Sequence, residues 1–379
     1  MPPLNDNGKK ILWVAHRDPL NPKAGGAERT IQEVCSRLVK RGNSITLLSG
    51  GFKGCKPVDD LKGIRIYRYG GPVGPHFALP VFLLKNNYDV VVNDLGHAVP
   101  WLSSTILGKK NITFFRHLHA RSLPGQVSPL IARLLTAIEK CYFIIHFNSI
   151  FVTESSTAKS DLSTLGIREN RIFTIPPGVD GKLFAPGPKT TYPSIIYFGG
   201  MRKYKRPQEC IFLMQNIVEK LPNIKLFIVG SGPEESNLRN LTRVLKLEAF
   251  INFMGKATDE DLSKIVSSSW LNIHSSVTEG WGLSILEASA SGTPTVAYRV
   301  PGVEDVIEHG VNGLKVSNGD RASLVEASLS ILYHPERWWR STMEVAKKYS
   351  WEETVQRWEQ MLEEIMKDGK YNPTKRSIQ

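Results

Sequence analysis

The chain alternates short apolar strands with amphipathic helices, and it does so in two successive series. Strand-like runs rich in Val, Ile, Leu and Phe are each followed by a segment with helical spacing. This alternation predicts parallel sheets covered by helices, which is the α/β class. Because 379 residues exceed what one hydrophobic core usually serves, we expect two doubly wound, Rossmann-like domains.

A segment rich in Pro and Gly, PPGVDGKLFAPGPKTTYP, separates the two series. Such composition is typical of an interdomain linker. The expected organisation is a first domain over 1–176, a linker over 177–193 and a second domain over 194–350. We expect a helix over 351–367 to follow, and a flexible tail over 368–379.

The tract EGWGLSILE carries the strongest functional pattern. Glu279 and Glu287 enclose Gly280 and Gly282, and the pattern predicts that a helix begins near Leu283. The glycines let the backbone approach a ligand, and the first amides of a helix favour a phosphate. Two carboxylates around an anion site suit the hexose, diphosphate and ribose of a nucleotide sugar. The alternative is that both glutamates are solvated.

This tract resembles the E-x7-E signature of the retaining glycosyltransferases of family 4, which have the GT-B fold. The match continues at Gly292, Pro294, Pro301, Gly302, Glu304, Asn312 and Gly313, and the resemblance extends from about residue 11 to about residue 358. It implies two domains that face a central cleft, with the final helix crossing back to the first domain. It also implies hexose transfer from a nucleotide-diphosphate sugar to a hydroxyl acceptor, without a cofactor or a metal.

The resemblance assigns roles to individual residues. Lys205, in GGMRKYKRP, matches the lysine that binds the donor diphosphate. Glu279 would position sugar hydroxyls and Glu287 the ribose. His117 matches the histidine beside the donor sugar. The implied catalytic set is therefore His117, Lys205 and Glu279.

Several glycines are expected to line the donor site. Gly25 and Gly26 open the first long helix, and Gly230 and Gly232 follow a strand in a GxGP turn. Each pair resembles a family loop near the donor, although either one is also compatible with an ordinary βα turn.

The chain departs from the family pattern beside Gly199, the glycine that ends the first strand of the second domain. The family usually has Arg in the next position, and this chain has Gly200. We hypothesise that Arg202, two residues further on, reaches the same anion.

Histidines also end strands of the first domain. His97 and His119 are predicted to line the acceptor side, and the alternative for each is packing in the core. Arg116 is expected either at the site or as a salt-bridge partner.

The net charge of +12 favours anionic partners. No RNA-binding signature accompanies it, so no nucleic acid is expected. Apolar stretches at 70–85 and 128–147 suggest contact with an anionic membrane and a glycan or lipid-linked acceptor, although core packing explains such stretches more often. The scattered cysteines and the absence of an apolar leader predict a cytoplasmic location. A peripheral position at the inner face of the membrane is compatible with this prediction.

Two other functions remain open at this point. One is a nucleotide-sugar epimerase or phosphorylase with the same fold. The other is a degenerate GT-B protein that binds an anionic polymer, a reading that Gly200 favours.

Overall fold

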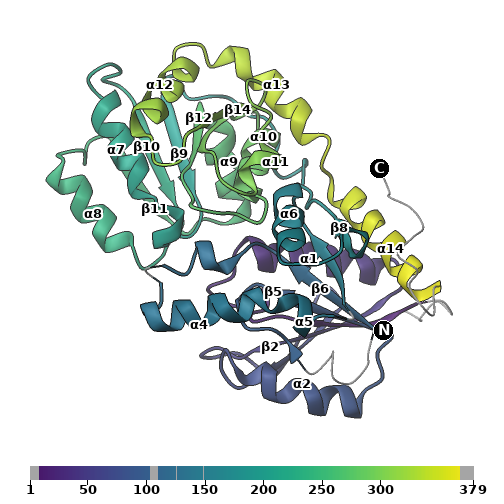
Figure 1. Cartoon of the computed structure of the whole chain (residues 1–379). Coiled ribbons are helices and arrows are strands. Elements are labelled where there is room, and N and C mark those ends of the chain that lie inside the picture. The colour runs from purple at the N-terminus through teal and green to yellow at the C-terminus, as the bar shows by residue number, and fades with distance from the viewer. Residues whose placement is uncertain (1–7, 103–109, 125, 148, 368–379) are drawn as a thin grey trace. The chain divides into compact units, whose positions relative to one another are not determined.

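The computed structural model describes residues 8–102, 110–124, 126–147 and 149–367. The expected tail over 368–379 lies outside the described residues. The chain divides into two compact units, one made of 1–176 with 351–379 and the other of 177–350 (Figure 1). Both are α/β units, as the alternation of strands and helices predicted.

The first unit is built on one eight-stranded sheet with the order β3-β4-β2-β1-β5-β6-β7-β8. Its strands are β1 Lys10–Val14, β2 Ser44–Gly50, β3 Val58–Leu61, β4 Ile64–Tyr69, β5 Val90–Leu95, β6 Asn111–Phe115, β7 Ile150–Thr153 and β8 Ile172–Thr174. All neighbours are parallel except β3 and β4, which form an antiparallel pair. The central strands are buried on both faces, which explains their continuous apolar sequences.

Helices cover this sheet. They are α1 Gly26–Lys40, α2 Gly74–Lys85, α4 Pro129–Lys140, α5 Tyr142–Ile145, α6 Ser156–Thr164 and α14 Trp351–Lys367, with short 3-10 turns η1 His119–Arg121 and η2 Glu169–Arg171. The apolar stretch that begins at residue 128 forms two helices, α4 and α5, and not one continuous helix. Cys141 leaves the helical conformation with ψ 5°, and Tyr142 turns into the core, where its hydroxyl donates to the Ala98 carbonyl at 2.9 Å.

The final helix α14 packs on the first unit. The Trp358 ring lies 5.1 Å from the Trp13 ring of β1 and 5.4 Å from the Phe114 ring of β6. At the surface, Arg41 at the end of α1 pairs with Glu352 at 2.7 Å and also with Glu359. The last helix therefore completes a core formed by residues more than two hundred positions earlier.

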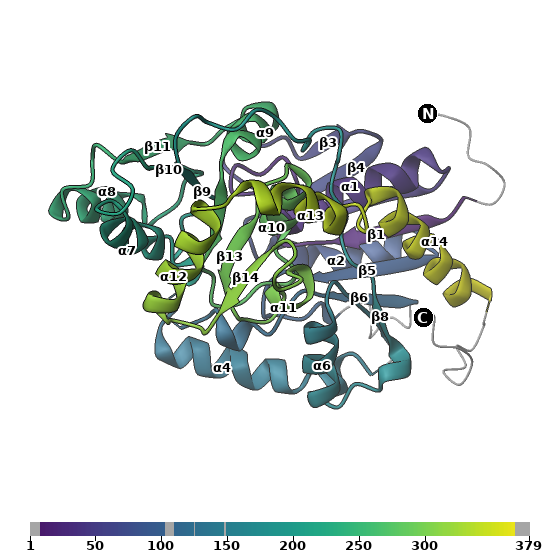
Figure 2. The same ribbon diagram turned by 90° about the horizontal axis from the view of Figure 1, so that it is seen from above.

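The second unit contains a six-stranded, wholly parallel sheet with the order β11-β10-β9-β12-β13-β14. Its strands are β9 Ser194–Phe198, β10 Lys225–Val229, β11 Ile251–Gly255, β12 Leu271–His274, β13 Thr295–Tyr298 and β14 Gly313–Val316. Its helices are α7 Gln208–Ile217, α8 Glu235–Val244, α9 Asp259–Ser268, α10 Leu283–Ala290, α11 Val303–Val306, α12 Arg321–Leu332 and α13 Glu336–Ala346, with the 3-10 turn η3 Lys203–Lys205. Figure 2 shows the chain passing from α12 through α13.

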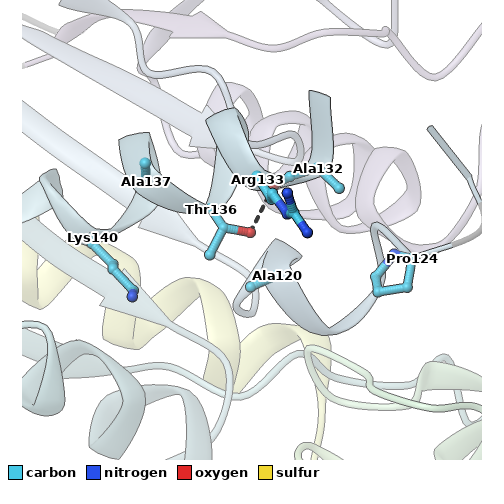
Figure 3. A pocket seen from close by; sticks show the side chains of 7 residues that line it. All are labelled: Ala120, Pro124, Ala132, Arg133, Thr136, Ala137 and Lys140. Carbon is cyan, nitrogen blue, oxygen red and sulfur yellow. Dashed lines mark hydrogen bonds between the residues drawn. The ribbon is translucent and has the colours of Figure 1, made fainter. Parts of the chain in front are cut away.

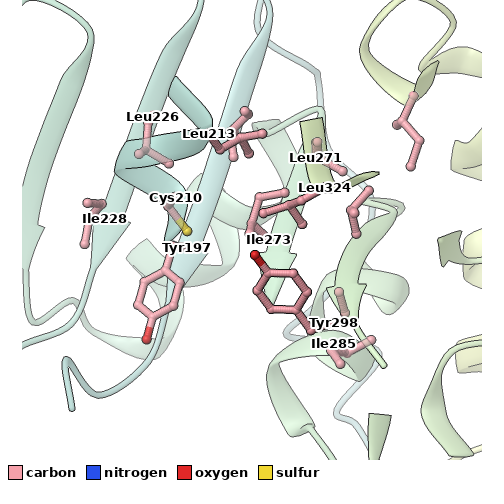
Figure 4. Close-up of a cluster of buried hydrophobic side chains, with 14 of the residues drawn as sticks. Tyr197, Cys210, Leu213, Leu226, Ile228, Leu271, Ile273, Ile285, Tyr298 and Leu324 are labelled. Atoms are coloured by element: carbon pink, nitrogen blue, oxygen red, sulfur yellow. The ribbon is translucent and has the colours of Figure 1, made fainter. Parts of the chain in front are cut away.

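Side chains from the sheet and from α7, α10 and α12 form the core of this unit (Figure 4). Ile273 of β12 and Leu324 of α12 are among the buried members. The strands that carry the loops of this unit are therefore anchored in a packed core.

In each sheet, the order in which successive strands are added reverses at one strand. The order turns at β1 in the first unit and at β9 in the second, because the next strands along the chain lie on either side of each. In such sheets ligands bind at the carboxyl ends of the strands beside the turning point. These edges are therefore where a site is expected in each unit.

Candidate active site

Two backbone turns approach each other closely at the carboxyl ends of β9 and β10. A Cβ atom on Gly230, which has φ +132°, would lie 2.0 Å from the Gly199 carbonyl oxygen. A Cβ atom on Gly232 would lie 2.3 Å from the Met201 carbonyl oxygen. The glycines of this turn are thus required by backbone packing, and the packing fixes the position of the η3 segment that follows Met201.

The central feature of the second unit is a contact between Lys205 and Glu279. The Lys205 Nζ atom lies 2.5 Å from Glu279 Oε1, and His274 Nε2 lies 3.1 Å from the same oxygen. His274 ends β12, and its Nδ1 atom is 3.2 Å from the Ser284 hydroxyl of α10. Side chains from η3, β12 and the loop before α10 therefore meet at one carboxylate.

This contact changes the ionisation of both partners. Burial opposes the charge of Lys205, but the Glu279 carboxylate outweighs it and raises the pKa of the amine. Burial also disfavours ionised Glu279, but Lys205 and the His274 hydrogen bond hold the pKa of the carboxyl well below its usual value. The pair is therefore charged on both sides at neutral pH.

Backbone contacts hold the pair from two sides. The Val277 amide donates to the Tyr204 carbonyl at 2.8 Å, which ties η3 to the loop before Glu279. The Glu279 amide donates to the Pro301 carbonyl at 3.1 Å. A Cβ atom on Gly302, with φ +82°, would lie 2.5 Å from the Glu279 carbonyl oxygen, so only glycine lets this loop press on the site.

The helix predicted after Gly282 is present, and α10 begins at Leu283 with Gly282 as its N-cap. The Ile285 amide bonds back to the Gly282 carbonyl at 2.9 Å, so the helical pattern starts immediately. Glu287 lies one turn further along and is only 8% exposed. The solvated alternative for this glutamate is therefore excluded.

Other residues of the same tract have structural roles. The Asn312 side chain accepts from the Glu308 amide at 2.8 Å and donates to the Val306 carbonyl at 3.0 Å. Glu304 pairs with Lys315 at 2.7 Å. These contacts shape the loops after β13.

Arg202 folds back over Gly200. A Cβ atom on Gly200 would lie 3.6 Å from Arg202 Nε, so the guanidinium occupies the space beside the glycine. Its charge also acts against the protonation of Lys205, which places the two cations near each other. Within the part of the chain that the structure describes, the Arg202 side chain has no carboxylate partner.

In the first unit, Gly25 and Gly26 begin α1 at the carboxyl end of β1. The Glu28 side chain accepts from the Gly25 amide at 2.7 Å and from Arg17 Nε at 2.9 Å. This capping arrangement uses the glutamate to hold the glycine turn in place.

Arg116 is a salt-bridge partner, one of the two predicted possibilities. Its guanidinium contacts Asp94 at 2.7 Å and Glu154 at 2.6 Å, and all three side chains are buried. It also donates to the Ala27 carbonyl of α1 at 3.3 Å. The network joins the ends of β5, β6 and β7 to the start of α1.

The strand-end histidines lie beside this network. The His117 ring is 5.0 Å from the His119 ring. The His119 amide donates to Glu139 of α4 at 2.6 Å, and its Nδ1 atom is 3.3 Å from the same carboxylate oxygen. His97 follows β5 and accepts a hydrogen bond at Nδ1 from the Val99 amide at 3.1 Å. Their neighbouring strands place them along one edge of the first sheet.

A shallow recess lies between α4 and η1 (Figure 3). It is lined by Ala120, Pro124, Ala132, Arg133, Thr136, Ala137 and Lys140. Its surface is mostly apolar, with two cations from α4. The Ala120 amide donates to Glu139 at 3.0 Å, so the recess adjoins the segment that carries His119.

Neither a metal cluster nor a membrane span is found in residues 8–102, 110–124, 126–147 and 149–367. No three His, Cys, Asp or Glu side chains in these ranges are arranged to hold a metal ion. None of the helices described there is long and apolar enough to cross a bilayer.

Comparisons with known proteins agree with this architecture. Residues 24–182 match the model for Glycosyltransferase Family 4, and residues 181–350 match that for Glycosyl transferases group 1. The fold is similar to sucrose-phosphate synthase from Thermosynechococcus elongatus, with a TM-score of 0.83 and 20% identity over 95% of this chain and 99% of that one. The protein is therefore a glycosyltransferase of the GT-B class.

Two curated relatives are transferases or synthases by name. The chain is 24% identical to the GDP-mannose-dependent alpha-(1-6)-phosphatidylinositol monomannoside mannosyltransferase of Mycobacterium tuberculosis, over 86% of this chain and 90% of that protein. It is 29% identical to N-acetyl-alpha-D-glucosaminyl L-malate synthase of Bacillus anthracis, over 46% of each chain. The chain belongs to glycosyltransferase family 4, group 1.

Sequence reasoning missed His274 and Glu139. His274 stands at the end of the buried strand β12, which is the same signal that singled out His117. Glu139 carried no such signal, because it reaches His119 from a helix that begins ten residues after that histidine.

Proposed function

We propose that this protein transfers a hexose from a nucleotide-diphosphate sugar to a hydroxyl acceptor, with retention of the anomeric configuration. The observation that carries the proposal is the meeting of Lys205, Glu279 and His274 at the carboxyl ends of β9 and β12, beside the start of α10. The resemblance to retaining family 4 enzymes supports the stereochemical part.

The donor would lie along this edge. Glu279 would position hydroxyls of the sugar, and Glu287 those of the ribose. Gly280 precedes the helix start, and the amides near Gly282 and Leu283 would face the diphosphate, because the first amides of a helix favour anions. The name of the mycobacterial relative supports a nucleotide-linked donor.

Catalysis would consist mainly of stabilising the diphosphate leaving group. Lys205 is already neutralised by Glu279, whereas Arg202 has its guanidinium unpaired among the described side chains. We infer that Arg202 supplies the charge that the family takes from the arginine beside the strand-end glycine. His117 would lie beside the sugar, and the Gly25 and Gly26 amides would face the diphosphate.

A panel of radiolabelled nucleotide sugars, screened for hydrolysis and transfer, tests the activity. In the active combination, Lys205→Ala and Arg202→Ala should each lower turnover by about tenfold or more, because each removes charge from the leaving group. Lys203→Ala is the matched control, since that exposed lysine lies in the same turn. Equal, mild losses in all three variants would mean that the phosphates are held elsewhere.

We further propose that the acceptor is lipid-linked or a glycan at an anionic membrane surface. One face of α2 exposes Phe77, Val81 and Leu84, and the N-cap residue Val73 is exposed as well. One face of α4 exposes Leu130, Ile131 and Leu134, with Arg133 and Lys140 beside it. Exposed apolar stripes flanked by cations are typical of helices that lie in a membrane interface.

The charges on these helices support the choice of an anionic surface. α2 contains no acidic residue, and the single acid of α4, Glu139, is buried against backbone amides of η1. The recess beside Arg133 and Lys140 combines an apolar floor with two cations (Figure 3). Such a surface suits a phosphate-bearing amphiphile.

Sedimentation with phosphatidylcholine vesicles, with and without phosphatidylglycerol, tests this contact. The protein should bind the anionic vesicles and lose binding as salt rises. The double variant Leu130→Ser/Leu134→Ser should bind several-fold less, whereas Val244→Ser, at an exposed position of α8, should bind normally. Failure of the unchanged protein to bind would reject the membrane contact without touching the transferase proposal.

The polymer-binding alternative rests on the net charge of +12 and on Gly200. Thermal shift separates the two functions. A transferase gains stability from a nucleoside diphosphate by mass action, whereas a polymer binder responds to a polyanion and loses that response steeply with salt.

A further inference from the structure

The turn that carries Lys205 ends in a residue with left-handed backbone. Arg206, directly after η3, has φ 47° and ψ 50°. A residue other than glycine is strained in this conformation. Such strain persists only where the surrounding contacts hold the residue in place, so the contacts of Arg206 need a physical account.

The loop after β12 donates hydrogen bonds to three successive carbonyl groups of this turn. The Val277 amide donates to the Tyr204 carbonyl at 2.8 Å. The Ser275 hydroxyl lies 2.9 Å from the Lys205 carbonyl oxygen and 2.8 Å from that of Arg206, so its one proton is shared between them. Because Ser275 is buried, water does not compete for these bonds.

The Arg206 side chain returns to the same loop. Its Nε atom donates to the Ser275 carbonyl at 2.8 Å, and its Nη2 atom donates to the Ser276 carbonyl at 3.1 Å. The Nη2 atom also donates to the Asn318 side chain at 2.6 Å, and the guanidinium lies 4.8 Å from the centroid of the Tyr298 ring. One guanidinium therefore joins the end of η3 to the loops after β12 and β14 and to the last residue of β13.

The ring under the guanidinium is fixed in turn. The Tyr298 hydroxyl donates to Glu209 Oε2 at 3.0 Å, and the Glu209 carboxylate pairs with Arg321 at 2.8 Å. Glu209 lies in the first turn of α7 and Arg321 in the first turn of α12. Arg206 is thus supported by a ring that two helices hold in place.

These reciprocal contacts set the distance between Lys205 and Glu279. Lys205 belongs to η3, and the loop after β12 continues to Glu279. Their ion pair joins the same two segments that the Arg206 and Ser275 side chains bind together. A shift of one segment against the other would therefore move Lys205 Nζ away from its partner.

We propose that Arg206 is a positioning residue of the donor site: its guanidinium holds η3 against the loop after β12, so that Lys205 meets both Glu279 and the donor diphosphate. The inference rests on the proposed function, which gives the diphosphate to Lys205. Glycine would adopt the left-handed backbone without strain but would lack every contact of the guanidinium. Lysine would keep the charge but lose the planar fork that reaches several acceptors.

Hydrogen exchange followed by mass spectrometry tests the contact without any substrate. In Arg206→Gly, amides in 203–206 and 275–279 should exchange several-fold faster, because the two segments are no longer joined by the side chain. Lys246→Gly is the matched control, since Lys246 is exposed, has φ 55° and lies in the same unit. It should leave exchange in both segments unchanged. Unchanged exchange in Arg206→Gly would overturn the proposal.

A double-variant comparison separates positioning of Lys205 from a general structural role. With the active donor and acceptor, Arg206→Gly should lower kcat about tenfold, because a displaced group loses much of its effect. Arg206→Lys should lower it less, and Lys246→Gly should leave it unchanged. In the Lys205→Ala protein, adding Arg206→Gly should lower kcat by less than about twofold, because the group to be positioned is already gone.

Other results would reject the proposal. An equal, tenfold loss from Arg206→Gly with and without Lys205 would show that the two residues act independently. Should Arg206→Gly fail to fold, Arg206→Lys provides the same comparison, and equal losses in both backgrounds would again reject the role. Absence of transfer by the unchanged protein would reject the proposed function, whereas the exchange measurement would still decide whether Arg206 holds the two segments together.

Discussion

Replacing Glu279 by Gln separates the ion pair that this residue forms with Lys205 from its proposed role in positioning the donor sugar. The carboxylate lies 2.5 Å from Lys205 Nζ and 3.1 Å from His274 Nε2. The Glu279 side chain is 12% exposed and that of Lys205 is 22% exposed. Gln keeps the size and one acceptor oxygen but removes the charge. It leaves a largely buried ammonium without its counter-charge.

The expected loss of stability follows from that burial. Breaking a fully buried pair costs about 3–5 kcal/mol, whereas an exposed pair contributes at most about 1 kcal/mol. Because water still reaches part of Lys205, we expect the free energy of unfolding to fall by about 2 kcal/mol. Urea denaturation at pH 7 measures it. Glu308→Gln, which removes the exposed partner of Lys348, should leave the midpoint unchanged.

The pH dependence provides a second measure of the same contact. The pKa of Glu279 is lowered in the folded protein, so the unfolded chain takes up the proton first as the pH falls. The stabilisation is complete above the usual pKa of 4.5 and is lost progressively below it. Glu279→Gln should therefore flatten the acid side of the stability curve.

Glu279→Gln should affect nucleotide binding and sugar transfer in different directions. Removing the carboxylate releases the Lys205 charge, so a nucleoside diphosphate should bind as tightly as before or several-fold tighter. Transfer should nevertheless fall by about a hundredfold, because the sugar loses its positioning group. Titration calorimetry and the transfer assay measure these separately. Weaker nucleotide binding together with unchanged stability would refute the role of the pair.

Three further predictions concern stability. Burial lowers the pKa of His146 to about 4, so the unfolded chain binds a proton at this residue first as the pH falls. The free energy of unfolding should therefore decrease by about 3 kcal/mol between pH 6.5 and 4. Thermal denaturation at a series of pH values measures this loss, and His146→Gln should remove it. Gly232→Ala should lower the free energy of unfolding by about 2 kcal/mol or more, because the new Cβ meets a backbone oxygen at 2.3 Å; a denaturation midpoint equal to that of the unchanged protein would contradict the packing argument. Trp358→Ala should cost about 3–5 kcal/mol in the same assay, because its buried ring fills the space against Trp13 and Phe114, and a loss below about 1 kcal/mol would show that α14 is weakly attached.

Local patterns in the sequence predicted much of the fold. The alternation of strands with helices and the helix start after Gly282 were both predicted, because apolar strand-like runs and a glycine before an apolar helical run are local signals. The helix α2 was not recognised, since Pro75 and Pro80 argue against a helix. Pro75 in fact lies in its first turn, where the missing amide costs little.

The candidate site also has a part that the sequence indicated and a part that only the tertiary structure decided. The sequence by itself determined which residue types stand at strand ends and helix starts, and so it indicated Lys205, Glu279 and the strand-end histidines. Only the tertiary structure decided that Lys205 and Glu279, 74 residues apart, share an ion pair. It also decided that Arg202 lies over Gly200 and that Glu139 of α4 contacts His119. Backbone propensity and hydrophobic period act over a few residues, whereas the pairing of charges depends on which loops the packed sheets bring together.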